Sequence, residues 1–282
     1  MIRNSPPGDA DIAALERRAT NLRRHMLTMV RGQGQGYIGQ GLGIADVLAA
    51  LYFYELRYDP ENVTWSERDR FLLSTGHYSV ALWAALCEAG IVPLEELSTY
   101  GADDSRLEMS TLDTTPGVEL IGGSLGHGLG QAVGQALGLR LVKSVARVFV
   151  ELSDGEMQEG STWEAAMAAG HFGLDGLVAL VDCNGIQADG PLVLDMEPVA
   201  EKWRAFGWDV TEIDGNDMHA IIGALMLARA KNGKSKAIIL RTLPGKGVAR
   251  IEASEKSHFF HVDVAEWDGI IADFEQKMGA QL

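Results

Sequence analysis

Residues 147–190 read RVFVELSDGEMQEGSTWEAAMAAGHFGLDGLVALVDCNGIQADG, which is the strongest structural signal in the chain. A short apolar run ends in Ser153-Asp154-Gly155, a helical segment follows, and a second apolar run ends in Asp182-Cys183-Asn184. A strand–helix–strand unit of this kind predicts two neighbouring parallel strands. In open α/β sheets, ligands bind at the carboxyl ends of the strands. The stretch therefore predicts an α/β fold with a ligand-binding site at the carboxyl edge of its sheet.

The same alternation continues on both sides of this stretch. We expect helices at about 11–31, 44–56, 78–89, 121–142, 159–173, near Ala200, 219–230 and 264–277. Strands are expected at about 70–74, 147–153, 177–183, 208–213 and 237–242, whereas residues 31–43 contain too much glycine for a helix. The pattern predicts an α/β protein with a doubly wound, mainly parallel sheet and helices on both faces. We expect residues 1–282 to form a single domain, with about the first ten residues flexible.

Composition narrows the class of protein. Apolar residues make up 46% and charged residues 22% of the chain, which is ordinary globular usage. The formal charge of −15 disfavours nucleic acid and anionic membrane surfaces as partners. Neither a signal peptide nor an apolar run of membrane-spanning length is present, and Cys87 and Cys183 lie in apolar surroundings. We therefore expect a cytoplasmic protein with two reduced core thiols.

Two strand ends carry oxygen-bearing side chains. Asp154 follows the first strand of the quoted stretch and Asn184 follows the second. Carboxylate and amide oxygens are hard ligands that suit Mg²⁺ or Ca²⁺. Gly155 allows a ligand to approach the backbone closely. Asp-Gly or Asn-Gly alone is most simply a turn after a strand, but two adjacent strand ends with oxygen ligands favour a metal site that leaves positions open for phosphate oxygens.

The arrangement resembles the thiamine-diphosphate motif, usually written GDG and, about thirty residues later, NN or NG. The flanking residues resemble two-subunit transketolases in particular. The matching blocks are STGHYS (74–79), TPGVE (115–119), GGSLGHGLGQAVG (122–134), EGSTWEAAMAAGHFG (159–173), FGWDV followed by EIDGND (206–217), and TLPGKGV (242–248). The resemblance extends from about Ala13 to the end of the chain. It implies the thiamine-diphosphate-binding (PP-type) fold and the N-terminal subunit of a split transketolase.

The resemblance also implies a set of cofactor residues. Asp154, the Asn184 side chain and the Ile186 carbonyl would bind Mg²⁺, for which Ca²⁺ or Mn²⁺ could substitute. Gly155 and Glu156 would contact the diphosphate. The backbones of two further residues would approach the aminopyrimidine of thiamine diphosphate, namely Gly123 and Leu125.

Three residues match family positions near the chemistry. His77 corresponds to a histidine that touches the diphosphate and the active centre, although it could simply begin a helix. His258 corresponds to a histidine between diphosphate and substrate, with the neighbouring His261 as the alternative. Glu159 corresponds to an acid at the dimer interface that couples two active sites, although it could also be a helix N-terminal acid stabilised by the dipole.

Other positions depart from the family pattern. Ser153 replaces the first glycine of GDG, where a small side chain should still fit. Tyr37 occupies the place of a family histidine in GQGYIGQG, and Met109 stands about where a GHP triplet is usual. Losing two imidazoles leaves a more apolar channel with fewer groups that can hydrogen-bond or transfer a proton. We therefore expect an unusual ketose donor or acceptor.

Thiamine chemistry needs a carboxylic acid beside the aminopyrimidine. In transketolases this glutamate belongs to a pyrimidine-binding domain that lies C-terminal to the part matched here. We therefore expect the partner to be a C-terminal transketolase subunit, in an α2β2 assembly that acts on ketose and aldose substrates. The alternatives are an α subunit of a keto-acid decarboxylase or dehydrogenase, and a cofactor-binding partner without catalytic activity.

Overall fold

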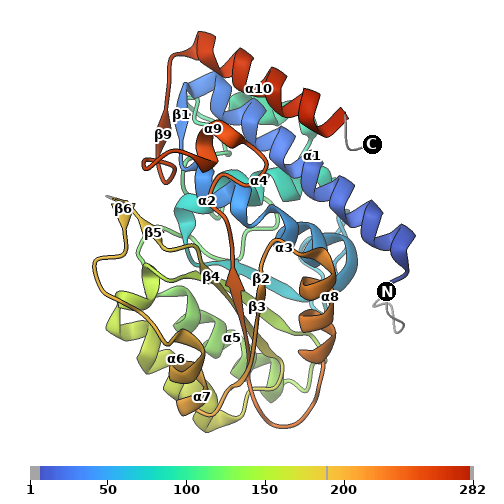
Figure 1. The fold of residues 1–282 in the computed structure, drawn as a ribbon. Helices are drawn as coiled ribbons and strands as arrows, with labels where there is room; N and C mark the ends of the chain where they lie inside the picture. Colours follow the sequence, from blue (N-terminus) through green and yellow to red (C-terminus); the bar gives the residue numbers. More distant parts are fainter. Residues whose placement is uncertain (1–6, 189, 280–282) are drawn as a thin grey trace.

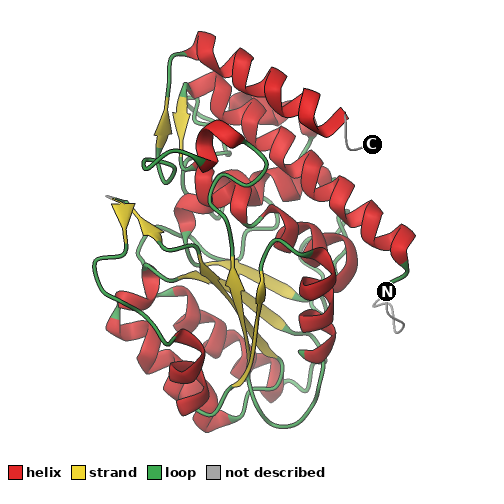
Figure 2. Ribbon diagram, viewed as in Figure 1, coloured by secondary structure: helices red, strands yellow, loops and turns green. Residues whose placement is uncertain are grey.

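The computed structural model describes residues 7–188 and 190–279, and a parallel sheet lies at its centre (Figures 1 and 2). The strand order is β2-β3-β4-β8-β7, and all neighbouring pairs are parallel. The strands are β2 (Arg70–Leu73), β3 (Val148–Ser153), β4 (Leu177–Cys183), β8 (Lys236–Arg241) and β7 (Asp209–Asp214). Burial on both faces explains the near-continuous apolar runs of β2, β3, β4 and β8, whereas the edge strand β7 is more polar and partly exposed. The predicted α/β class and parallel sheet are confirmed.

Helices cover both faces of the sheet, as expected for a doubly wound fold (Figure 1). One apolar core, which includes Phe149 and Leu180, lies under α1 (Asp9–Gln33), α3 (Ala45–Ala50), α4 (Ser79–Glu88), α8 (Met218–Leu227) and α10 (Val264–Gly279). The other, which includes Val150 and Val181, lies under α5 (Gly128–Leu141), α6 (Gly160–Phe172) and α7 (Val199–Ala205). Alternate residues of each strand thus supply the two cores.

Residues 31–43 were predicted to be non-helical, and this was wrong for part of the segment. Ile38–Gly43 forms the helix α2, and all six of its residues are buried. A Cβ on Gly39 would lie 2.2 Å from the Ser257 carbonyl oxygen, and one on Gly41 would lie 3.0 Å from Val80. The glycines allow the neighbouring segments to approach this helix closely. Burial against α1 and α4 therefore outweighs the low helix propensity of glycine.

Short elements join distant parts of the chain. β1 (Gln35–Gly36) pairs in antiparallel fashion with β9 (Phe260–His261), and β5 (Ile186–Gln187) pairs with β6 (Gly190–Pro191). The other short elements are α9 (Ala249–Glu252), a π-helical turn (Leu51–Glu55), and 3-10 turns at Gly76–Tyr78, Leu94–Thr99 and Glu156–Gln158. The β1–β9 pair places the segment around His258 beside the one that contains Tyr37. None of these short elements follows from periodicity in the sequence.

The ten N-terminal residues were expected to be flexible; residues 1–6 lie outside the described part, and α1 begins at Asp9. Within residues 7–188 and 190–279, no helix combines the length and apolar character needed to cross a membrane.

A buried ion-pair network joins the amino ends of β2 and β3, at the edge opposite the predicted site. The Glu55 carboxylate accepts hydrogen bonds from Arg147 Nη1 at 2.6 Å and from Arg229 Nη2 at 2.6 Å. Asp69 accepts the backbone N–H of Arg147 at 2.8 Å and that of Arg57 at 3.0 Å. The side chains of Glu55 and Asp69 are fully buried. Removing one carboxylate would leave buried guanidinium groups without their counter-charge.

We predict that Glu55→Gln lowers the free energy of unfolding by about 3–5 kcal/mol, because a neutral amide cannot balance two guanidinium charges in this buried setting. Denaturant unfolding followed by circular dichroism measures the change. Arg204→Ala is the control, because Arg204 pairs with Glu201 at the surface, and its loss should cost no more than about 0.5 kcal/mol. Equal effects of the two variants would contradict the prediction.

Candidate active site

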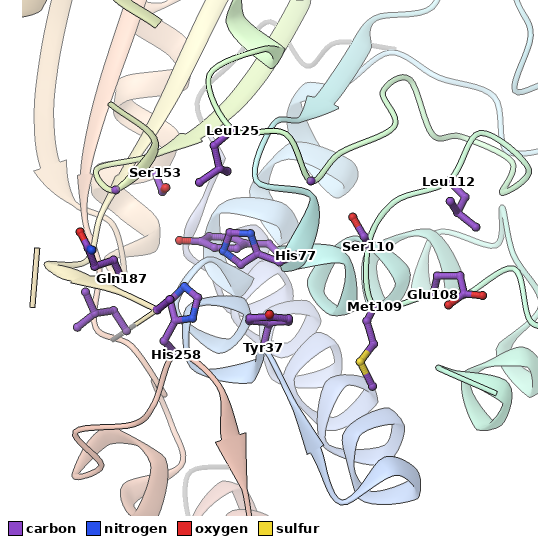
Figure 3. A pocket seen from close by; sticks show the side chains of 15 residues that line it. Tyr37, His77, Glu108, Met109, Ser110, Leu112, Leu125, Ser153, Gln187 and His258 are labelled. Atoms are coloured by element: carbon purple, nitrogen blue, oxygen red, sulfur yellow. The ribbon is translucent and has the colours of Figure 1, made fainter. Parts of the chain in front are cut away.

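A cavity of about 940 Å³ lies at the carboxyl edge of the sheet (Figure 3). In the view of Figure 3, Ser153 and Gln187 lie at one end, Glu108 and Leu112 at the other, and the rings of Tyr37, His77 and His258 between them. The lining residues are Tyr37, His77, Tyr78, Glu108, Met109, Ser110, Leu112, Gly123, Leu125, Ser153, Gly155, Ile186, Gln187, Ala188 and His258. The loops that follow β2, β3 and β4 supply much of this wall, which is where parallel strands place ligands.

The two side chains among the three predicted metal ligands, Asp154 and Asn184, come from neighbouring strand ends. β3 and β4 pair in the register that sets Ser153 opposite Asp182, so the residues after the strands lie close together. Asp154 Oδ1 accepts the N–H of Gly155 at 2.8 Å, and Oδ2 accepts the N–H of Gly185 at 2.7 Å. Asn184 Oδ1 accepts the N–H of Ile186 at 3.0 Å. Each oxygen thereby has a fixed direction and keeps a lone pair for a further partner.

This donor set fits a hard divalent cation. Burial raises the pKa of the Asp154 carboxyl to about 6, and the hydrogen bonds from Gly185 and Gly155 oppose that shift. A buried carboxylate with only backbone donors around it is a group that a bound cation would stabilise in its charged form. No cluster of three or more His, Cys, Asp or Glu side chains suited to a metal occurs in the described residues. A metal here would depend on an amide and a carbonyl as well as on one carboxylate, as the sequence predicts.

Gly155 is a glycine that the folded chain itself does not require. Its φ of −61° suits any residue. A Cβ at this position would meet Gln187 at 3.7 Å and Ser153 at 3.8 Å, which are ordinary contacts. Since Gly155 lines the cavity, the absence of a side chain keeps that part of the cavity open. This fits the predicted close approach of a diphosphate to the backbone.

Glu156, which is predicted to contact the diphosphate, has its side chain beneath the loops of the cavity wall. Its side chain is fully buried, it is not among the described residues that line the cavity, and its N–H donates to Ser153 Oγ at 3.1 Å. Its Oε1 accepts from Ser74 Oγ and, at 2.7 Å, from the N–H of Gly126. The carboxylate thus joins the loops after β2 and β3 to the loop before α5. Burial raises its pKa to about 6 against these hydrogen bonds.

Two glycines hold the cavity loops against each other. A Cβ on Gly76 would lie 2.4 Å from the Gly122 carbonyl carbon, and one on Gly122 would lie 2.3 Å from the Gly76 Cα. The backbones are therefore in direct contact, and neither position can carry a side chain without movement. The contact places His77, which follows Gly76, beside Gly123 on the same wall.

His77 and His258 meet in the cavity although they are far apart in the sequence. Their ring centroids are 5.1 Å apart, and Tyr37 packs edge-on against both, at 5.2 Å from His77 and 5.5 Å from His258 (Figure 3). Burial lowers the pKa of the His77 imidazole to about 3, and repulsion from His258 adds to the shift. His77 is therefore neutral at physiological pH, with one ring nitrogen able to donate a hydrogen bond and the other able to accept one.

The structure distinguishes His258 from His261 and locates Glu159 relative to the cavity. His261 lies on β9 and is exposed, whereas His258 lines the cavity. Glu159 is exposed, precedes α6, and is not among the described residues of the cavity wall. Its Cβ would lie 2.7 Å from a side chain placed on Gly126. Glu159 is thus at the surface beside the cavity loop, where a second chain could reach it.

The remaining predicted residues line the cavity. Gly123, Leu125 and Ile186 form part of the wall, as do the departures Tyr37 and Met109. Sequence reasoning missed Tyr78, Glu108, Ser110, Leu112, Gln187 and Ala188 as lining residues. It also missed the buried Glu151, whose Oε2 accepts from Thr75 Oγ1 at 2.5 Å and whose pKa burial raises. A carboxylate inside the apolar run RVFVELS was the signal that could have identified Glu151.

Comparison with known proteins identifies relatives over almost the whole chain. Residues 15–279 match the family described as the transketolase thiamine diphosphate binding domain. A transketolase family protein of Sinorhizobium fredii is 54% identical over 90% of this chain and 92% of its own length. A 6-deoxy-6-sulfo-D-fructose transketolase subunit of Clostridium is 38% identical, covering 93% of this chain and 97% of the relative. One subunit of the apulose-4-phosphate transketolase of Phocaeicola vulgatus is 36% identical, covering 95% and 96%.

Solved structures show the same fold in longer chains. The transketolase of Leishmania mexicana superposes with a TM-score of 0.87 at 30% identity over 94% of this chain. The match covers 41% of that protein, so the chain spans about two fifths of its length.

We predict that the neutral state of His77 is visible by NMR. With ¹³C-labelled histidine, the His77 signal should show no inflection between pH 5 and 8, because its pKa lies near 3. The spectrum of His77→Asn identifies the signal, since only that signal disappears. An inflection between pH 5 and 8 in the assigned signal would overturn the assignment of a neutral ring. In the unfolded chain a histidine takes up its proton near pH 6.5. Because the pKa of His77 is lower in the folded state, the free energy of unfolding decreases as the pH falls below that value.

Proposed function

The chain belongs to the transketolase family, within its thiamine-diphosphate-binding domain, and on that premise we propose that it is one subunit of a split transketolase. The reaction is the transfer of a two-carbon ketol unit between sugars. The relatives from Clostridium and Phocaeicola vulgatus, which match this chain over nearly their full lengths, are named as transketolase subunits. None of the relatives described above is named as a keto-acid decarboxylase or dehydrogenase. These names favour ketol transfer.

One observation carries the cofactor part of the proposal. Asp154 and Asn184 present fixed oxygens at neighbouring strand ends, next to a glycine that only an approaching ligand would require. We propose that Asp154, Asn184 and the Ile186 carbonyl bind Mg²⁺, or Ca²⁺ or Mn²⁺ in its place. Gly155 would lie against the diphosphate of thiamine diphosphate. The cation offsets the repulsion between a diphosphate and a protein of charge −15.

The chain's own residues have distinct parts in this reaction. Thiamine diphosphate supplies the carbanion chemistry when it is bound. Gly123 and Leu125 bound the side of the cavity on which the aminopyrimidine would lie. His77, which is neutral, and His258 hold ring nitrogens between the diphosphate end and the far end of the cavity, where hydrogen bonds to a substrate can form. Tyr37 packs against both rings and keeps them together, which preserves their geometry.

The proposal includes a partner protein. The glutamate that thiamine chemistry needs would come from a C-terminal transketolase subunit with a pyrimidine-binding domain, in an α2β2 assembly. Exposed groups lie beside the cavity where such a subunit would pack: Ile121 is 56% exposed, and Gly123 and Glu159 are exposed. Glu159 would contact the second copy of the assembly.

The far end of the cavity supports an unusual substrate. Met109 and Leu112 lie there, and the described lining contains no lysine or arginine. A tyrosine and a methionine at this wall offer fewer hydrogen bonds to sugar hydroxyls than two imidazoles would. The relatives from Clostridium and Phocaeicola vulgatus are named for 6-deoxy-6-sulfofructose and apulose 4-phosphate. We propose a ketose or aldose outside the xylulose 5-phosphate and ribose 5-phosphate pair.

We predict that the tagged chain co-purifies with a pyrimidine-domain protein from its native host. The pair should transfer ketol units when thiamine diphosphate and Mg²⁺ are added, and the chain alone should not. A chain that arrives alone, binds the cofactor and stays inactive with every neighbouring gene product would contradict the proposal and favour a non-catalytic cofactor-binding protein. Keto-acid substrates in the same assay test the decarboxylase alternative.

Two variants test the cofactor residues in that complex. Asp154→Ala should abolish Mg²⁺-dependent binding of thiamine diphosphate, measured by calorimetry, while circular dichroism shows an intact fold. Gly155→Ala should weaken cofactor binding without loss of stability, because its methyl group clashes with nothing in the chain. Unchanged cofactor affinity in Asp154→Ala would remove the metal assignment.

A substrate panel tests the role of the two substituted positions. The complex should turn over xylulose 5-phosphate and ribose 5-phosphate at least about tenfold less efficiently than its best ketose, which corresponds to about 1.4 kcal/mol of transition-state binding. Tyr37→His with Met109→His should raise kcat/KM for the standard pair, and Tyr37→Phe is the matched control that adds no imidazole. Efficient turnover of the standard pair by the unmodified complex would refute the unusual-substrate proposal.

A further inference from the structure

Asp182 is a buried carboxylate that none of the assignments above uses. It lies on β4, two residues before Asn184, and its side chain is fully buried. Its Oδ2 accepts from the Tyr78 hydroxyl at 2.9 Å and from Asn184 Nδ2 at 2.6 Å. Its Oδ1 accepts from the Thr242 hydroxyl. Every hydrogen-bonding group that faces this carboxylate is thus a donor.

These contacts determine which end of the Asn184 amide faces the cavity edge. Asn184 Nδ2 also donates to the Tyr78 hydroxyl oxygen at 2.9 Å, so both of its hydrogens are used on the buried side. Oδ1 lies on the other side and accepts the N–H of Ile186. A flipped amide would set its carbonyl oxygen 2.6 Å from a carboxylate oxygen and its NH₂ against an N–H. Both contacts would be repulsive, so the observed orientation is the only one these neighbours allow.

We propose that Asp182 is a positioning residue for the cation: together with Tyr78 and Thr242, it holds Asn184 so that oxygen, and not nitrogen, faces the metal. This inference rests on the proposed function. Groups that orient metal ligands typically change metal affinity by about 10- to 100-fold when they are mutated. The three groups come from three separate segments, after β2, on β4 and after β8. The orientation of one amide therefore depends on the correct assembly of three strand ends.

The test compares the affinity for thiamine diphosphate with and without Mg²⁺. Calorimetric titrations of the complete complex in a series of Mg²⁺ concentrations and in EDTA yield the gain in affinity due to the metal. Asp182→Asn should reduce this gain by about 10- to 100-fold, because its own amide can donate to Asn184 and permit the flip. Tyr78→Phe should reduce it less, since one acceptor of Asn184 Nδ2 remains. Thr242→Ser keeps the hydroxyl and should retain the wild-type gain.

Asp69→Asn is the matched control, since it makes the same substitution at a buried aspartate on the opposite edge of the sheet. It should lower thermal stability while leaving the metal-dependent gain unchanged. Asp182→Asn with a wild-type gain would overturn the proposal. So would an equal loss of affinity with and without Mg²⁺, because that result describes a purely structural role. If the unmodified complex shows no Mg²⁺-dependent binding, the proposed function itself fails, which separates the two failures.

Discussion

Parallel pairing of β3 and β4 is the constraint on which the candidate site depends. Because both strands run in one direction, the residues that follow them must emerge at one edge, and the register of Ser153 with Asp182 sets Asp154 and Asn184 side by side. β2 delivers the turn before His77 to the same edge, and β8 delivers Thr242. The distances within the site therefore follow from backbone hydrogen bonds. The sheet fixes the backbone positions of the residues after its strands, and their side chains supply the chemistry at those positions.

A second constraint is the cost of burying carboxylates beneath that edge. Glu151, Asp154, Glu156 and Asp182 are all buried, and burial raises the pKa of each one. Hydrogen-bond donors offset part of that cost. Glu151 Oε1 and Glu156 Oε2 have no partner among the described residues, whereas the other oxygens of these four carboxylates accept hydrogen bonds. Here hydroxyls, backbone N–H groups and the Asn184 amide act as the donors, so each carboxylate also connects segments that are distant in the sequence. Thus the same hydrogen bonds stabilise the acids and hold the cavity walls in place.

The sequence predicted those features of the fold and the site that depend on residues close together in the chain. The strand at Leu177–Cys183 and the juxtaposition of Asp154 with Asn184 follow from apolar runs and strand ends. It did not predict those features whose conformation depends on contacts between distant segments. The α2 helix forms in a glycine-rich segment because it is wholly buried, and the choice between His258 and His261 depends on the β1–β9 pair. Glu156 matched a family position, yet its carboxylate faces Ser74 and Gly126, which no pattern in the chain indicates.

The β1–β9 pair has a consequence for protein synthesis. It joins Gln35–Gly36 to Phe260–His261, which are separated by most of the chain, and it carries the neighbours of Tyr37 and His258. Closing so long a loop is slow compared with local folding. During translation, the sheet and the helices that precede β9 can pack while β9 is still inside the ribosome. The cavity acquires its second histidine only after residues 258–261 have left the ribosome, so a shorter nascent chain cannot hold a complete site, however well its core has formed.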